Sequence, residues 1–97
     1  MKYTIEFAES VKEQLKNLTA NQRTTIFDSI EKQLFNEPLV ETRNRKPLRP
    51  NPIAPWELRV GDFRVFYDFE DVDRLKIVAV GHKEHNDLYI RGKKVAL

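Results

Sequence analysis

Two arginines and a histidine stand at spacings that predict a shared surface. Arg59 and Arg64 flank Gly61-Asp62, a pair that is typical of a two-residue hairpin turn between strands. With that turn Arg59 lies opposite Arg64, and the strand that follows brings His82 to the same face. Arginine offers a planar fork that fits a phosphate, and histidine titrates near neutral pH. The pattern therefore predicts a face that can bind or cleave a phosphodiester.

The same residues also allow a purely structural interpretation. Like charges that oppose each other across two strands destabilise a sheet, so the arginine pair needs a partner, which Glu57 and Asp68 can supply as a surface ion network. His82 can be an ordinary histidine at a strand end, His85 a solvated loop residue, and Tyr89 a packing residue. Spacing alone leaves both interpretations open.

Further cations are unevenly distributed, although the formal net charge of the chain is only +2. Residues 38–55 carry Arg43, Arg45, Lys46 and Arg49 against the single acid Glu41, and the last seven residues carry Arg91, Lys93 and Lys94. A basic side of this kind suits a phosphate backbone or an acidic protein partner. The alternative is scattered charge that keeps the chain soluble.

Length and composition exclude several classes of protein. With 97 residues and no cysteine, we expect one domain over residues 1–97, without disulfides, a thiolate nucleophile or a thiolate zinc site. Two histidines make a weak metal site, so we expect no metal and no cofactor. The longest apolar run, Ile77 to Val80, is far too short to span a membrane. The first residues alternate in polarity, unlike a secretion signal, which predicts a cytoplasmic protein.

The elements that must position these side chains follow from periodicity. Residues 3–7 alternate like a half-buried strand, and Ser10 with Glu13 predicts a capping box at the start of a helix. A second capping box at Thr19 and Gln22 predicts another helix, which runs to about Phe35 and forms a hairpin with the first. Residues 38–55 hold all five prolines and are expected to form an irregular connection, partly ordered over the surface.

Three strands complete the predicted order of strand, two helices and a three-stranded meander. A three-residue turn over residues 71–73 pairs Phe66 with Val78 and Arg64 with Val80. The face expected to pack on the helices then comprises Trp56, Leu58, Phe63, Val65, Tyr67, Ile77 and Ala79. For the tail from Glu84 the sequence allows two conformations, a short helix or an extended segment around residues 86–90.

Several of these segments together resemble the RelE/ParE toxin superfamily, and the resemblance covers nearly the whole chain. They are YTIEF at the start, the helical hairpin that closes at Pro38, KPLR at residues 46–49, WELRVGDFRVFY at residues 56–67 and VGHK at residues 80–83. The resemblance implies an α+β RelE-like fold of order β-α-α-β-β-β, with a helical hairpin on one face of a small, mainly antiparallel sheet.

The resemblance also implies roles for individual residues. Arg64 stands where RelE-like toxins have the arginine that stabilises phosphate charge, and Arg59 falls where a basic residue holds RNA. Glu57 departs from the pattern, because a second cation is often found there. Lys83 corresponds to a basic residue after Val-Gly, and Tyr89 to a C-terminal tyrosine that stacks on a base or assists proton transfer. His82 is added as an acid or base on its chemistry alone.

The implied function is that of a toxin from a toxin–antitoxin module, which cuts messenger RNA on the ribosome through attack of the RNA 2′-hydroxyl. The alternatives are a ParE-like inhibitor of DNA gyrase without nuclease activity, and a degenerate member that only binds its partner and operator DNA. The implied partners are a cognate antitoxin, the ribosome with its messenger RNA, and operator DNA through the antitoxin complex. The basic residues of 43–49 and 91–94 are the candidate RNA or antitoxin contacts.

Overall fold

The structure is a computed structural model that describes residues 2–96. Its elements are β1 (Thr4–Phe7), α1 (Glu9–Lys16), α2 (Ala20–Leu34), β2 (Arg45–Pro47), β3 (Trp56–Val60), β4 (Phe63–Asp71), β5 (Arg74–Glu84), β6 (Asp87–Ile90) and β7 (Lys93–Val95). The predicted order is confirmed, and three short strands, β2, β6 and β7, are added to it.

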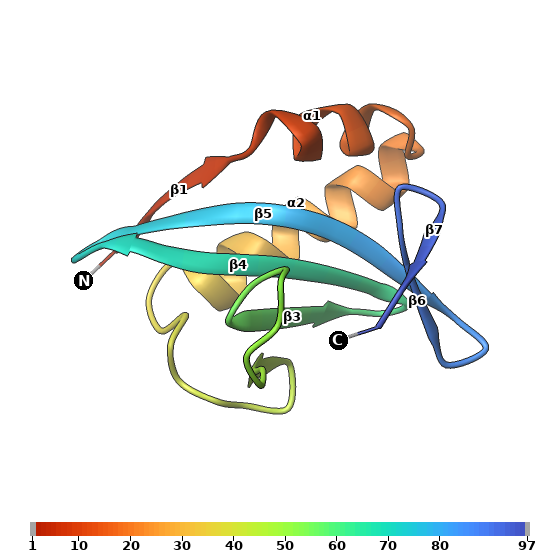
Figure 1. Ribbon diagram of the computed structural model, residues 1–97. Helices are drawn as coiled ribbons and strands as arrows, with labels where there is room; N and C mark the ends of the chain where they lie inside the picture. The colour runs from red at the N-terminus through yellow and green to blue at the C-terminus, as the bar shows by residue number, and fades with distance from the viewer. Residues whose placement is uncertain (1, 97) are drawn as a thin grey trace.

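The strands form one sheet, with both helices on one of its faces (Figure 1). Within residues 2–96 the strand order is β2-β3-β4-β5-β6-β7, all antiparallel, and β1 pairs in parallel with the first part of β5. The predicted α+β class, with a helical hairpin on a mainly antiparallel sheet, is therefore confirmed.

The two helices start in different ways. At α2 the predicted capping box is present, because the Gln22 amide donates to Thr19 Oγ1 at 3.1 Å and the Thr19 amide donates to Gln22 Oε1 at 3.0 Å. At α1 the predicted capping box of Ser10 is wrong, since Ala8 is the N-cap and no side chain caps the helix. The Ala8 amide still donates to the Ile77 carbonyl at 3.0 Å, so the chain passes directly from the β1–β5 ladder into α1.

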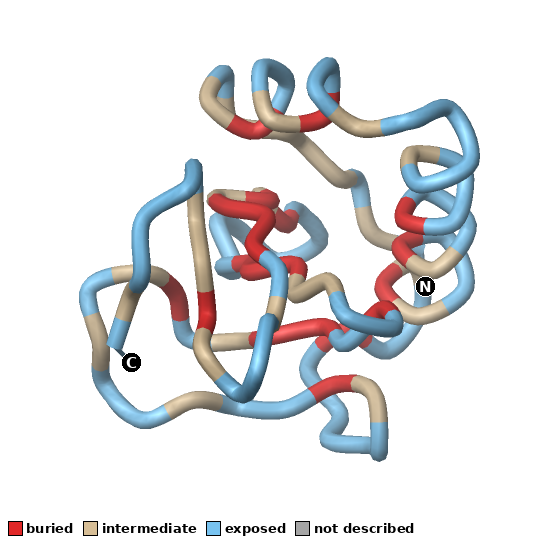
Figure 2. Tube along the Cα trace, turned by 90° about the vertical axis from the view of Figure 1, so that its right-hand side faces the viewer, coloured by how far each residue is buried: buried red, intermediate tan, exposed pale blue. Residues whose placement is uncertain are grey.

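Apolar side chains pack on both faces of the sheet. The main core lies between the helices and the sheet, as the buried segments in Figure 2 show, and comprises Val11, Leu15, Ile26, Ile30, Leu34, Leu58, Val60, Val65, Tyr67, Leu75, Ile77 and Val80. A smaller cluster on the other face contains Ala54, Phe66, Ala79 and Leu88, with Leu48 and Ile53 packed against it. The proline-rich connection thus covers part of the second face.

The register of the strands decides which side chains share a face. The predicted β3–β4 pairing is confirmed, from Val60 opposite Phe63 to Trp56 opposite Tyr67. Between β4 and β5 the register shifts, because Phe66 pairs with Ala79 whereas Tyr67 pairs with Ile77, which leaves Val78 as an extra residue. The predicted pairing of Phe66 with Val78 is therefore wrong.

This shift moves the second half of β5 by one residue. Arg64 lies opposite Gly81 rather than Val80, and His82 lies opposite Phe63. Ala79 consequently packs in the smaller cluster instead of facing the helices. The turn after β4 also differs from the prediction, since Asp71 pairs with Arg74 across a two-residue turn.

The tail is extended. Glu84 pairs with Asp87 and Ile90 pairs with Lys93, so two-residue turns join β5 to β6 and β6 to β7. The residues of these turns, His85, Asn86, Arg91 and Gly92, all have positive φ angles, from 51° to 74°. Turns of this type match the twist of the flanking strands. Of the two conformations that the sequence left open, the extended one is found.

Candidate functional site

Arg59 and Arg64 lie directly opposite each other on β3 and β4. The turn between them uses Gly61 at φ 58°, a conformation that glycine adopts without steric cost. Phe66, two residues beyond Arg64 on the same strand face, packs in the smaller cluster on the side away from the helices. The two guanidinium groups therefore share the face of the sheet that is remote from α1 and α2.

The side chain of Arg64 is only partly satisfied. Its Nη1 donates to the carbonyl oxygens of Gly61 and Phe63, both at 2.8 Å. Its Nε is buried and has no hydrogen-bond partner among the described residues. A guanidinium carries five donors in a fixed plane, so Nη1 holds Arg64 to the backbone, and Nη2, which makes no hydrogen bond among the described residues, can donate to an anion.

Arg59 has an acidic neighbour. Its Nε lies 3.5 Å from Oε2 of Glu57, whose side chain is only 7% exposed, against 44% for Arg59. Asp68, the other acid that could pair with these arginines, accepts a hydrogen bond from the Phe69 amide. Within residues 2–96 no carboxylate lies within 4.0 Å of Arg64. The ion network that the sequence allowed is thus present for Arg59 and not for Arg64.

Lys83 joins the two arginines on this face. Its amide donates to the Asp62 carbonyl at 2.7 Å, and along β5 it alternates with His82, so its side chain leaves the sheet on the same side as that of Arg64. We call Arg59, Arg64 and Lys83 the cation face. Three positive charges with one buried carboxylate can bind a phosphate and stabilise extra negative charge on it.

His82 and Tyr89 lie on the opposite, helix-facing side of the sheet. The prediction that His82 shares a face with Arg59 and Arg64 is wrong, because the shift at Val78 turns it to the other side. His82 pairs with Tyr89 on β6, and their rings stack with centroids 5.6 Å apart and planes 23° apart. The five predicted catalytic residues therefore divide into two groups on two faces.

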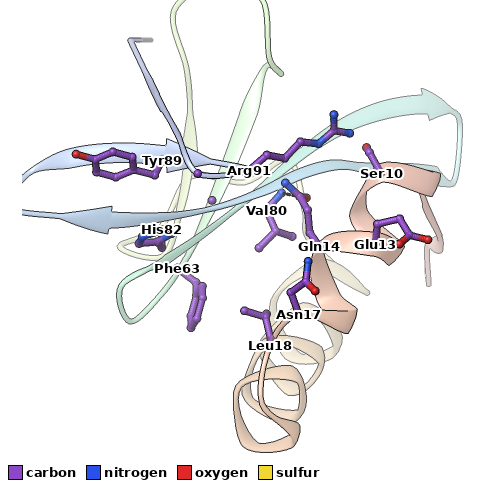
Figure 3. A pocket seen from close by; sticks show the side chains of 12 residues that line it. Ser10, Glu13, Gln14, Asn17, Leu18, Phe63, Val80, His82, Tyr89 and Arg91 are labelled. Atoms are coloured by element: carbon purple, nitrogen blue, oxygen red, sulfur yellow. Dashed lines mark hydrogen bonds between the residues drawn. The ribbon is translucent and has the colours of Figure 1, made fainter.

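A groove lies between α1 and the strands that carry His82 and Tyr89 (Figure 3). It has a volume of about 630 Å³, within the range of small-molecule sites. One wall is formed by Ser10, Glu13, Gln14, Asn17 and Leu18, and the other by Phe63, Val80, Gly81, His82, Tyr89, Arg91 and Gly92. The α1 residues of this groove were not predicted from the sequence.

Three of the four predicted cations in the proline-rich connection are exposed: Arg43, Lys46 and Arg49. Arg45 is an exception, because it is buried at 8% exposure. Its Nε donates to the Val40 carbonyl at 3.0 Å and its Nη1 donates to the Gln33 carbonyl. The expectation that Arg45 contacts a partner is therefore wrong, and its charge ties β2 to the end of α2.

The cations of the tail gather on the last hairpin. Arg91, Lys93 and Lys94 are all exposed, and Lys94 Nζ lies 3.5 Å from Asp87 Oδ1. Their hairpin folds beside the end of β5, next to the groove. The tail thus adds positive charge to the end of the sheet that also carries the cation face.

A metal centre and a membrane helix are absent from the described part of the chain. Among residues 2–96 no three histidine, cysteine, aspartate or glutamate side chains come together closely enough to bind a metal ion. None of the helices described there combines the length and the apolar character needed to cross a membrane.

Comparisons with known proteins agree with this architecture. Residues 5–87 match the family model of the ParE toxin of type II toxin–antitoxin systems, parDE. Among solved structures, the chain is similar to one in the crystal structure of the toxin–antitoxin complex RelBE2 from Mycobacterium tuberculosis, with 26% identity, a TM-score of 0.72, and coverage of 86% of this chain and 100% of that one. No curated protein sequence matches the chain.

The family match, together with the fold, thus identifies a small toxin of a type II toxin–antitoxin system. The chain belongs to the ParE toxin family of type II toxin–antitoxin systems. The resemblance to the RelE/ParE superfamily that the sequence indicated is confirmed.

Proposed function

We propose that this toxin is a ribosome-dependent messenger RNA endoribonuclease. The observation that carries the proposal is the Arg59–Arg64 pair on neighbouring strands, in which Nη1 of Arg64 is fixed by two carbonyl oxygens and Nη2 is left to donate to a phosphate. The similarity to a chain of the RelBE2 complex supports a RelE-like function over a ParE-like one. The site of action is expected in the cytoplasm.

The cation face suits the chemistry of RNA cleavage. Attack of a 2′-hydroxyl on the adjacent phosphorus forms a cyclic phosphate and breaks the bond to the 5′-oxygen, and negative charge builds up on the phosphate oxygens between the two events. Arg64 and Arg59 would stabilise that charge, and Lys83 would hold the neighbouring phosphate. A ribosome-dependent enzyme can take part of its positioning from the ribosome. The 2′-hydroxyl loses a proton and the 5′-oxygen gains one in this step. His82 and Tyr89 lie on the opposite face of the sheet, so they do not fit the proton-transfer roles at a phosphate on the cation face, and the two protons would be exchanged with water or with groups of the ribosome.

Primer extension on a defined messenger tests the proposal, with the toxin added to a purified translation system with and without ribosomes. We expect cuts at A-site codons only when ribosomes are present, and a loss of at least a hundredfold in cleavage rate for Arg64→Ala, because one preorganised donor to a developing oxyanion commonly contributes about that much. Arg74→Ala is the control, since Arg74 is an arginine of the same sheet that lies at its far end and is paired with Glu6 at 3.0 Å.

A second candidate function is inhibition of DNA gyrase. It is favoured by the match to the ParE family model and by Glu57, whose buried carboxylate reduces the charge of the cation face. Accumulation of cleaved DNA–gyrase complexes with intact messenger would select this function. Toxicity that survives Arg64→Ala in a folded protein would equally argue against the nuclease.

We further propose that a cognate antitoxin neutralises the toxin through an acidic, partly disordered segment. The RelBE2 structure is itself a toxin–antitoxin complex. The exposed cations that such a segment would contact are Arg43, Lys46, Arg49, Arg91, Lys93 and Lys94. Operator DNA would then be bound through the antitoxin complex.

A further inference from the structure

Arg59 and Arg64 occupy the closer of the two kinds of pair that alternate along an antiparallel ladder. The Arg59 amide donates to the Asn44 carbonyl at 2.8 Å, so it faces β2, and the pair with Arg64 is not hydrogen-bonded through the backbone. Side chains of such pairs lie closer together than those of hydrogen-bonded pairs. Two guanidinium groups at this place repel each other unless something draws them apart.

The two side chains are held in opposite directions along the hairpin. Nη1 of Arg64 donates to the carbonyl oxygens of Gly61 and Phe63, which lie on the side of the turn. Nε of Arg59 lies 3.5 Å from Oε2 of Glu57, which is two residues further from the turn. The arrangement that relieves the repulsion therefore also keeps the two guanidinium groups from converging on one phosphate.

Glu57 is a buried carboxylate that holds one cation. Its side chain is 7% exposed, in a row that begins with Lys46 on β2 and continues with Phe66 on β4. Within residues 2–96 Lys46 forms no ion pair with Glu57, and Arg59 does. A carboxylate away from water needs a charged or hydrogen-bonding partner, and loss of that partner is costly. Glu57 therefore resists the release of Arg59.

Arg59 stays accessible while Glu57 holds it. Its side chain is 44% exposed, and its Nη atoms make no hydrogen bond with any described residue. A phosphate can therefore contact either arginine alone, but both reach the same phosphate only after Arg59 leaves Glu57. That exchange leaves the buried carboxylate unpaired.

The exchange discriminates between free RNA and RNA that is already positioned. A flexible free strand has to lose its own conformational freedom and also displace Glu57 from Arg59. A messenger that another body holds in place has lost that freedom beforehand, so its phosphate competes for Arg59 at a higher effective concentration.

Asp68 shows that a carboxylate on this face need not take an arginine. It lies on the same face of β4, two residues beyond Phe66, and is exposed. Its Oδ1 accepts a hydrogen bond from the Phe69 amide at 2.7 Å, and in the described part of the chain it forms no ion pair. The pairing of Glu57 with Arg59 is thus specific to its place.

We propose that Glu57 is a specificity-determining residue, which holds Arg59 away from Arg64 and thereby keeps the toxin from binding free RNA tightly. The inference rests on the proposed function in that RNA is the ligand. Glu57 acts through Arg59, so it is a positioning residue rather than a catalytic one. The cation face is completed only by a phosphate that displaces the carboxylate.

Binding of free RNA in the absence of ribosomes tests the proposal. The probe is fluorescein-labelled 2′-O-methyl hexauridylate, which has no attacking 2′-hydroxyl and stays intact, and its anisotropy is measured at low salt. We expect Glu57→Gln to bind the probe about tenfold more tightly than the unmodified toxin, because Arg59 is released towards Arg64. Asp68→Asn is the matched control, since it removes one negative charge from the same face, and its affinity should change by less than about twofold.

Glu57→Met guards against a folding defect in Glu57→Gln. Replacement of a buried charge by an apolar side chain of similar size is often neutral or stabilising, so Glu57→Met should stay folded and show the same gain in affinity. Melting curves establish that each variant is folded at the temperature of the titration.

Combination with Arg59→Ala separates positioning from a general effect of charge. When Arg59 is absent, Glu57→Gln should improve binding no more than Asp68→Asn does, because there is no arginine left to release. An equal gain with and without Arg59 would overturn the proposal. Affinities of Glu57→Gln and Glu57→Met that match that of the unmodified toxin would also overturn it.

The assay distinguishes failure of this inference from failure of the proposed function. A gain in Glu57→Gln that requires Arg59, together with no ribosome-dependent cleavage by the unmodified toxin, would support the role of Glu57 and reject the nuclease. Ribosome-dependent cleavage by the unmodified toxin, together with binding of free RNA that is insensitive to Glu57, would support the nuclease and reject the role of Glu57.

Discussion

The hydroxyl of Tyr67 on β4 donates a hydrogen bond of 2.5 Å to the carbonyl oxygen of Pro38, just beyond the end of α2. Both residues are fully buried, and the Tyr67 ring stacks on Trp56 with centroids 6.1 Å apart. The bond joins the centre of the sheet to the start of the proline-rich connection. It therefore anchors the segment that leads into β2 and the exposed cations.

Removing this hydroxyl should destabilise the fold without touching either candidate site. Tyr67→Phe leaves the buried Pro38 carbonyl without its donor, which we expect to lower the free energy of unfolding by about 1–3 kcal/mol. Urea denaturation followed by Trp56 fluorescence measures the change. Ribosome-dependent cleavage at a temperature where the variant is folded should stay unchanged.

The same hydroxyl makes the free energy of unfolding depend on pH in the alkaline range. Burial raises the pKa of Tyr67 above its ordinary value of 10.0, and the nearby charge of Arg45 only partly opposes this. The folded protein therefore keeps this proton at a pH where the unfolded chain has lost it, so the stabilisation is complete below about pH 10 and decreases as the pH rises further. The gap in unfolding free energy between the unmodified protein and Tyr67→Phe should shrink above pH 10; a constant gap would contradict this.

Gly81 permits the close contact between β5 and β6. A Cβ atom at this position would lie 2.7 Å from the Tyr89 carbonyl oxygen and 2.9 Å from Ile90 Cγ1. Gly81→Ala should therefore displace β6 and lower the unfolding free energy by about 1–3 kcal/mol. The control is Gly92→Asn, because nothing lies within 4 Å of its Cβ and asparagine tolerates φ 74°. Equal stability of both variants would show that β6 adapts.

The sequence predicts the fold well and the candidate site only in part. Alternation gives the strand faces, and Gly61-Asp62 fixes the β3–β4 register, so the Arg59–Arg64 pair is found as predicted. The bulge at Val78 carries no local signal, because Ile77 to Val80 is uniformly apolar and accepts either register. The face of His82 is therefore decided by tertiary packing.

The remaining differences also have tertiary causes. Ala8 caps α1 because its amide completes the β1–β5 ladder, a contact between residues far apart in the sequence. Arg45 resembles its exposed neighbours in the sequence, but β2 pairs with β3 and turns its side chain towards the carbonyl groups at the end of α2. Tyr89 is brought beside His82 by the β5–β6 turn, in which His85 and Asn86 both have positive φ and no glycine marks the turn in the sequence.

Substitution of Arg45 should change the free energy of unfolding much more than substitution of its neighbour Lys46. Arg45→Ala removes a buried side chain and the donors of two carbonyl groups, so we expect a loss of about 3 kcal/mol in unfolding free energy. Lys46→Ala is expected to change stability by less than about 0.5 kcal/mol, because its side chain is exposed. Thermal and urea unfolding of the two variants, compared side by side, measures the difference.

The exposed cations of the proline-rich connection should instead act on binding. Replacement of Arg43, Lys46 and Arg49 by glutamine removes three positive charges and leaves the buried Arg45 in place. If an acidic antitoxin segment docks here, its dissociation constant should rise at low salt and depend less on ionic strength, because screened attraction between the charges is lost. Titration of the cognate antitoxin over a salt series measures both quantities.

The matched control replaces Lys12, Lys16 and Lys32, three exposed lysines on the helices, and should leave the salt dependence closer to that of the unmodified toxin. An affinity and a salt dependence that do not change in the first variant would place the antitoxin elsewhere, and the hairpin cations Arg91, Lys93 and Lys94 would be the next to replace.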